Sequence, residues 1–115
     1  MTTRKILVAR EEELLPGTTR KFQFDRNGQT VEAFVANVRG GYVAFVNRCV
    51  HVPVTLDLDD NDFFTCDGLF FVCKTHGSVY EPAAGKCIGG PGQGRGLERL
   101  PLVIESGAIY LEMVE

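Results

Sequence analysis

The sequence has no long apolar run and no excess of basic charge. A membrane-spanning helix needs about 20 consecutive apolar residues, and no stretch of the 115 residues approaches that length. Twelve basic residues against fifteen acidic ones give a net charge of −3, which is not the strongly basic balance of a nucleic-acid-binding domain. We therefore expect neither a membrane nor a nucleic acid as partner.

The sequence also lacks the pattern of a secretory leader. Behind Arg4 and Lys5 the apolar run covers only residues 6–9, which is shorter than the apolar region of a signal peptide. The expected location is therefore the cytoplasm, where structural disulfides are rare. In that compartment the four cysteines point first to metal binding or catalysis.

Helical patterns are scarce, and strand patterns recur along the chain. One helical turn is predicted within residues 10–15, because Pro16-Gly17 would end it. Asn27-Gly28 is a strong hairpin signal, and further turns are predicted at Arg39-Gly40-Gly41 and Ser106-Gly107. Strands are predicted at residues 5–9, 22–24, 31–38, 42–46, 69–73, 103–104 and 109–114. Short strands between turns predict one all-β domain, a sandwich or a barrel.

The two histidines of the chain each follow a cysteine closely. The first pair is Cys49-Val50-His51 and the second is Cys73-Lys74-Thr75-His76, with 21 residues between them. Thiolate and imidazole ligands suit zinc and iron–sulfur clusters. A Cys2His2 zinc site usually groups its cysteines together and its histidines together. The order Cys, His, Cys, His instead lets each loop give one ligand to each of two metal atoms, although two zinc loops or buried core residues remain alternatives.

This paired motif resembles the Rieske [2Fe–2S] family, whose pattern is C-x-H, a spacer and C-x-x-H. The resemblance extends to the His76–Gly77–Ser78–Val79–Tyr80 run and to Gly90-Pro91, and it covers about residues 42–113. It implies a Rieske-type antiparallel β-sandwich with a smaller inserted cluster-binding subdomain. The subdomain would span residues 46–91, and residues 1–45 and 92–115 would form the basal sandwich of this single domain, 1–115.

The resemblance also implies a role for each ligand of the cluster. Cys49 and Cys73 would hold the inner iron, and His51 and His76 the outer iron near the surface. Two thiolates add less negative charge than four, so Rieske centres have higher potentials than four-cysteine plant-type ferredoxins.

The surroundings of the cluster bear on its potential as well. Ser78 and Tyr80 match positions that donate hydrogen bonds to cluster sulfurs in high-potential members. Val54 and Thr75 stand where those members carry a disulfide, so we expect an intermediate to low potential.

The function implied by the resemblance is one-electron transfer. A stand-alone Rieske-type ferredoxin would accept an electron from a flavoprotein reductase and pass it to a terminal oxygenase or another redox enzyme, with His51 and His76 at the exit. We do not expect an enzyme, because both histidines are already used as ligands. The alternatives are a small subunit of a larger reductase, similar to that of assimilatory nitrite reductase, and a non-redox zinc-binding interaction module.

Three features remain beside the ligand motif. Cys66 and Cys87 are predicted to be small buried residues, or to form a disulfide with each other. Residues 89–96 hold five glycines and one proline, which suits a linker or a cover that brings backbone close to the cluster. The acidic residues between the ligand loops predict a solvated face or a docking patch for a basic partner; they are Asp57, Asp59, Asp60 and Asp62.

Overall fold

The structure is a computed structural model that describes residues 3–38, 41–48, 56, 63–65, 68–75, 77–91 and 95–114. The described elements are β1 (Thr3–Arg10), the 3-10 helix η1 (Glu11–Glu13), β2 (Thr19–Arg26), β3 (Gln29–Val38), β4 (Gly41–Val46), β5 (Phe71–Val72), β6 (Val79–Tyr80), β7 (Cys87–Gly89), β8 (Arg99–Leu100), β9 (Leu102–Glu105) and β10 (Ala108–Val114). All their pairings are antiparallel. The prediction of an all-β antiparallel fold is therefore confirmed.

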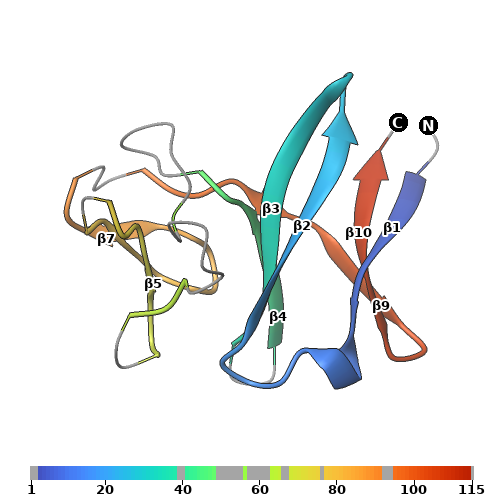
Figure 1. The fold of residues 1–115 in the computed structure, drawn as a ribbon, viewed down its shortest axis with the longest axis horizontal. Coiled ribbons are helices and arrows are strands. Elements are labelled where there is room, and N and C mark those ends of the chain that lie inside the picture. The colour runs from blue at the N-terminus through green and yellow to red at the C-terminus, as the bar shows by residue number, and fades with distance from the viewer. Residues whose placement is uncertain are drawn as a thin grey trace.

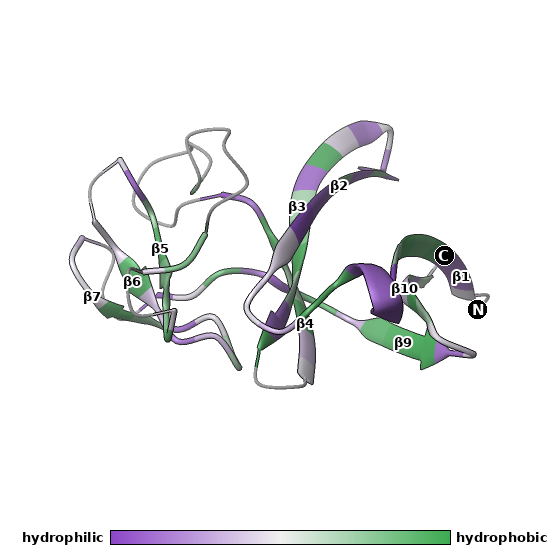
Figure 2. Ribbon diagram, turned by 60° about the horizontal axis from the view of Figure 1, so that its bottom comes forward, coloured by the Kyte–Doolittle hydropathy of each residue, from purple (hydrophilic) through white to green (hydrophobic). Residues whose placement is uncertain are grey.

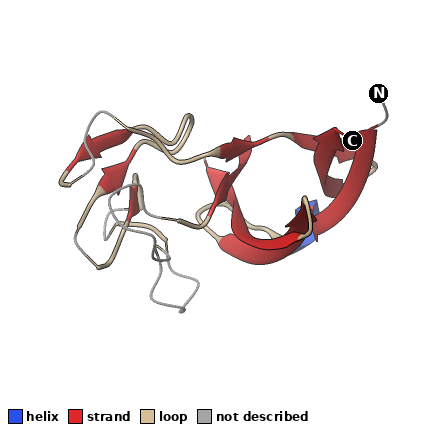
Figure 3. Cartoon of the chain, turned by 90° about the horizontal axis from the view of Figure 1, so that it is seen from above, coloured by secondary structure: helices blue, strands red, loops and turns tan. Residues whose placement is uncertain are grey.

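The strands form three sheets that lie side by side (Figure 1). The terminal sheet has the order β1-β10-β9, the central sheet β2-β3-β4-β8, and the small sheet β5-β6-β7. The view from above shows the same succession, with the central sheet between the other two (Figure 3). The chain ends meet in the terminal sheet, on the side away from the small sheet.

Strand β3 is buried on both faces because both faces of the central sheet are covered. Ala33 and Val35 point into a core shared with the terminal sheet, whereas Phe34 and Ala36 point into a core shared with the small sheet. Successive side chains of a strand alternate between its faces, so an uninterrupted apolar run suits a strand enclosed from both sides. Toward the β2–β3 turn, hydrophilic residues alternate with hydrophobic ones (Figure 2).

The predicted hairpin turns have the backbone that their sequences favour. Asn27 and Gly28 have φ values of 54° and 80° between the paired residues Arg26 and Gln29. Ser106 and Gly107 have φ values of 51° and 79° between β9 and β10. Two successive positive φ values define the type I′ turn, whose twist matches that of paired strands. Both predicted turns are confirmed.

Other local predictions have mixed outcomes. The helical turn at residues 10–15 is confirmed as η1, and Ile109 and Leu111 are buried on one face of β10 as expected. The strand expected at residues 69–73 is shorter, because only Phe71–Val72 pairs as β5. The turn at Arg39-Gly40-Gly41 lies partly outside the described residues. The proposed division at residues 46 and 91 stays a prediction.

Membrane insertion was not expected. Among the described residues, no helix has the length and apolar character of a membrane span.

Candidate metal centre

The second ligand motif lies in the hairpin loop between β5 and β6. The Cys73 N–H donates to the Ser78 carbonyl at 2.8 Å, and the Gly77 N–H donates to the Cys73 carbonyl at 2.8 Å. Gly77 has φ +77°, a left-handed conformation that glycine adopts without steric cost. The backbone of this loop is therefore fixed at both of its ends, at Cys73 and at Gly77–Ser78.

The residues that flank the first ligand motif are held beside this hairpin. The Leu56 N–H donates to the Asn47 side-chain oxygen at 2.9 Å, and the Lys74 N–H donates to the Leu56 carbonyl at 2.9 Å. In the sequence, Asn47 precedes Cys49 by two residues, and Leu56 follows the same motif. The two ends of this chain segment thus meet next to the residue that follows Cys73.

Asn47 is fixed from the central sheet as well. It is 4% exposed, its N–H donates to the Glu32 carbonyl at 2.9 Å, and its side-chain amide donates to a Glu32 carboxylate oxygen at 3.2 Å. A buried amide needs such partners, since an unsatisfied polar group is costly. Asn47 therefore links the central sheet to Leu56.

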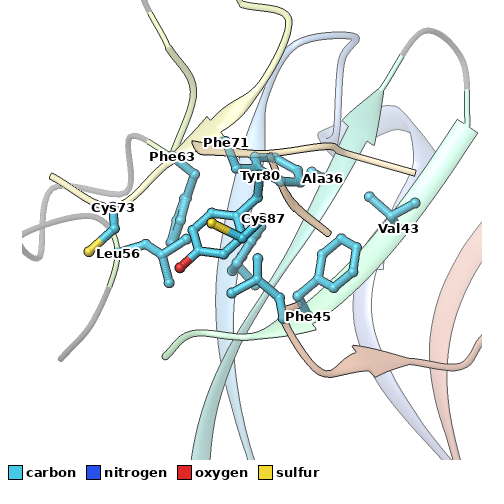
Figure 4. Packing of buried hydrophobic residues seen from close by; sticks show 11 residues of the cluster. Ala36, Val43, Phe45, Leu56, Phe63, Phe71, Cys73, Tyr80 and Cys87 are labelled. Atoms are coloured by element: carbon cyan, nitrogen blue, oxygen red, sulfur yellow. The ribbon is translucent and has the colours of Figure 1, made fainter. Parts of the chain in front are cut away.

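An aromatic core supports the hairpin from behind. Phe34 stacks on Phe63 at 4.0 Å between ring centroids and meets Phe71 edge-on at 5.2 Å. Cys73 and Tyr80 belong to the same core and are fully buried. Figure 4 shows the Tyr80 hydroxyl on the side where Leu56 and Cys73 lie. The Cys73 thiol therefore sits at the edge of a packed apolar layer.

The glycine–proline segment covers the same hairpin. A Cβ atom on Gly90 would lie 2.9 Å from the Gly77 carbonyl oxygen and 3.0 Å from the Ser78 Cα. Such contacts leave no room for a side chain, and Gly90 also has φ +77°. The buried Ser78 hydroxyl donates to the Pro91 carbonyl. The backbone at Gly90 thus approaches the ligand hairpin closely, and its predicted approach to the cluster stays a prediction.

The described residues fit an iron–sulfur cluster by their donor chemistry and by their packing. Cys73 supplies a thiol, the soft ligand that such clusters use, from a loop with fixed ends. The apolar core limits solvent, which is one determinant of a cluster's potential. The glycine at position 90 lets a second backbone segment pack against the ligand hairpin without a side chain between them.

The predicted site residues divide into two groups. Cys73, Ser78 and Tyr80 are described, and all three lie in or beside the β5–β6 hairpin. Cys49, His51 and His76 lie outside the described residues. Within the described part of the chain, no three metal-ligating side chains come together, and of the four predicted ligands that part contains Cys73 alone.

The remaining cysteines and the acidic run have a similar outcome. Cys87 is 1% exposed and is not in a disulfide, so its predicted burial is confirmed. Cys66 and the acidic residues Asp57, Asp59, Asp60 and Asp62 lie outside the described residues.

Sequence reasoning missed two contributors to this region. It assigned no role to Asn47, whose side chain holds Leu56. It also treated Cys87 as a small apolar residue, although its thiol contacts the segment 89–91 that covers the hairpin, called the cover below. Bonds between a side chain and a distant backbone group leave no periodic pattern in a sequence. The sequence offered only an asparagine two residues before a ligand motif.

Comparisons with known proteins agree with this architecture. The family model for the Rieske [2Fe-2S] domain matches residues 4–106. The Sphingomonas yanoikuyae B1 ferredoxin superposes with a TM-score of 0.73 at 22% identity, covering 96% of this chain and 100% of that chain. The ferredoxin of carbazole 1,9a-dioxygenase from Nocardioides aromaticivorans IC177 superposes with a TM-score of 0.69 at 21% identity, covering 93% and 95%.

A longer protein contains the same fold as one part. The terminal oxygenase of carbazole 1,9a-dioxygenase from Novosphingobium sp. KA1 superposes with a TM-score of 0.75 at 23% identity, covering 94% of this chain and 29% of that chain. A search of curated protein sequences finds no match.

The fold and the family match define a Rieske-type protein. Because the family model matches most of its length, the chain belongs to the Rieske [2Fe-2S] domain family, and its cofactor is a Rieske-type [2Fe–2S] cluster. The iron–sulfur interpretation of the paired motif is thereby favoured over the zinc alternative.

Proposed function

We propose that this protein is a one-electron carrier that passes electrons between a flavoprotein reductase and a terminal oxygenase. The observation that carries the proposal is the match of the Rieske family model to residues 4–106. The structural likeness to ferredoxins that this chain covers almost end to end supports a carrier. When bound, the cluster supplies a site for one electron.

We assign the cluster ligands as Cys49, His51, Cys73 and His76. The support for this assignment is the paired motif, the fixed hairpin that begins at Cys73, and the contact of Leu56 with Lys74. That contact places Leu56, which follows the first motif, beside Lys74, which belongs to the second. The thiolates would hold one iron and the imidazoles the other, so the histidines would form the exit for the electron.

The partner class follows from the solved complexes of similar fold. One of them is the complex of reduced oxygenase and oxidized ferredoxin in carbazole 1,9a-dioxygenase, of which one chain superposes with a TM-score of 0.73 at 22% identity. By analogy we propose a terminal oxygenase as the electron acceptor of this chain. We place the exchange in the cytoplasm, in keeping with the expectation from the sequence.

Metal analysis and electron paramagnetic resonance test the proposal directly. Protein purified without oxygen should contain about two irons and two acid-labile sulfides per chain, and the reduced form should give the signal of a Rieske centre. It should also reduce a one-electron acceptor such as cytochrome c after treatment with dithionite. Protein that holds neither iron nor labile sulfide would exclude the carrier function.

Gel filtration of the tagged protein from its native cells separates a carrier from a subunit. A monomer or small homo-oligomer that exchanges electrons only on mixing supports the carrier. Co-elution in a fixed ratio with a large reductase would favour the alternative of a reductase subunit.

A further inference from the structure

Cys87 closes the loop that carries the cover. Its N–H donates to the Arg95 carbonyl at 2.7 Å, and the neighbouring residues Lys86 and Gly96 form an antiparallel bridge. The chain between these pairs contains the Gly90-Pro91 segment. The backbone of Cys87 therefore lies where the two ends of the glycine-rich loop meet. It is paired with Tyr80 across the β6–β7 pair.

The side chain of Cys87 points into the loop that its backbone closes. Its sulfur lies 3.3 Å from the Gly89 carbonyl oxygen and 3.7 Å from the Pro91 carbonyl oxygen. The buried Ser78 hydroxyl donates to the same Pro91 carbonyl from the ligand hairpin. The Cys87 thiol from β7 and the Ser78 hydroxyl from the ligand hairpin thus both contact carbonyl oxygens of the cover, with the Gly89 oxygen the nearer acceptor for the thiol.

We propose that Cys87 and Ser78 are positioning residues of the cover. The Cys87 thiol fixes its backbone through the Gly89 and Pro91 carbonyls, and the Ser78 hydroxyl holds it on the ligand hairpin through the Pro91 carbonyl. Proline has no N–H, so its carbonyl is the backbone group by which Pro91 can be held. Gly90 packs against Gly77 and Ser78 at the same place. The inference rests on the proposed function for its purpose, which is to keep the cluster from being released.

This role differs from the one that the family resemblance implies for Ser78. A serine hydroxyl has a single proton to donate, and among the described protein atoms it is directed to the Pro91 carbonyl. Loss of the Ser78 hydroxyl should therefore loosen the cover and speed release of the cluster.

The role of Cys87 also differs from that of a small apolar residue. A cysteine that acts only as a buried hydrophobe is replaced better by alanine than by serine, because a buried hydroxyl without a partner is costly. If the thiol is a donor, serine keeps that function and alanine removes it. The two interpretations therefore predict opposite orders for C87S and C87A.

The experiment compares the rates of cluster release from wild type, C87A, C87S and S78A in excess chelator. The loss of visible absorbance measures the release. Losing a weak S–H donor should speed release about threefold in C87A, and losing a full hydrogen bond should speed it about fivefold in S78A. C87S should release its cluster at nearly the wild-type rate. Reduction potentials of wild type, C87A and C87S should agree.

Faster release from C87S than from C87A would overturn the donor role of Cys87. A lowered potential in S78A at an unchanged release rate would overturn the role of Ser78. Should C87A fail to fold by circular dichroism, S78A tests the same carbonyl from the other donor.

Amide hydrogen exchange of residues 88–90 separates this inference from the proposed function. In cluster-free protein, C87A should exchange these amides faster than wild type and C87S, and equal rates would contradict the clamp. A wild-type protein that never holds a cluster would instead contradict the carrier function and leave the exchange result readable.

Discussion

The two larger sheets and the small sheet are built in different ways. In the larger sheets, β1, β3 and β10 have seven to ten residues each. They pair with their neighbours along most of their length, with one register shift between Leu7 and Ala9 in the β1–β10 pair. In the small sheet, β5 and β6 have two residues each and β7 has three. Strands this short are not stable on their own in water.

The small sheet compensates with side-chain packing and single tertiary hydrogen bonds. Phe34 extends from the central sheet into its core, where it meets Phe63 and Phe71. Asn47 and Leu56 add backbone anchors beside the ligand hairpin. The two larger sheets, which form the scaffold, thus rely on strand pairing. The small sheet and its loops, which form the ligand region, rely on a few contacts and on the bound cluster. Its order should therefore depend on the cluster far more than that of the larger sheets.

The largest effect is expected from removing a ligand. His76→Ala should abolish the cluster, because one iron would lose a protein ligand. Iron and labile sulfide should fall to background while the far-ultraviolet circular dichroism of the two larger sheets persists. Retention of a normal cluster in H76A would contradict the ligand assignment.

Core substitutions on the two faces of the central sheet come next. Phe34→Ala should lower the free energy of unfolding by about 3–5 kcal/mol and release the cluster, because the aromatic core of the small sheet loses its centre. The matched control Ile109→Ala lies in the other core and should cost about 2–5 kcal/mol with the cluster retained until global unfolding. Urea titrations with both absorbance and circular dichroism measure these effects, and equal cluster loss in both variants would erase the contrast.

A pair of buried asparagines gives a smaller and better matched comparison. Asn47 holds Leu56 in the ligand region, and Asn37 donates to the Leu14 carbonyl at 2.9 Å in the scaffold. Replacing either by alanine removes a buried partner and should cost about 1–3 kcal/mol in unfolding free energy. We expect only N47A to speed cluster release, as measured with a chelator. Faster release from N37A would show that the two regions are coupled.

The smallest effect is expected from Tyr80→Phe. If the buried hydroxyl donates to a cluster sulfur, its loss should lower the reduction potential by on the order of tens of millivolts. The ring packing remains, so stability should change little. Redox titration measures the shift, and an unchanged potential would exclude the contact.

The sequence predicted the scaffold because its signals are local. Asn27-Gly28 and Ser106-Gly107 determine their turns through two positive φ values, and the alternation of Ile109 and Leu111 identifies the buried face of β10. Each of these patterns spans a few neighbouring residues, so it can be recognised without knowledge of the rest of the chain.

Less of the structure of the ligand region could be predicted from the sequence, for a physical reason. Strands β6 and β7 are too short to show an alternation of apolar and polar residues. The contacts of Asn47 with Leu56 and of Cys87 with Pro91 depend on the tertiary fold, which brings separate parts of the chain together. The paired cysteine and histidine motif nevertheless led to the family, because ligand chemistry restricts residue type more strongly than packing does. The positions of Cys49, His51 and His76 stay predictions.

The pairing of Thr3 with Val114 joins the two chain ends in the terminal sheet, at the far side from the ligand hairpin (Figure 1). A linker fused there would leave the small sheet uncovered. Such a fusion could tether the protein to an electrode or to an engineered reductase in a defined orientation. The same geometry allows a circularly permuted chain in which a short loop joins the old ends and new ends open at the Ser106-Gly107 turn.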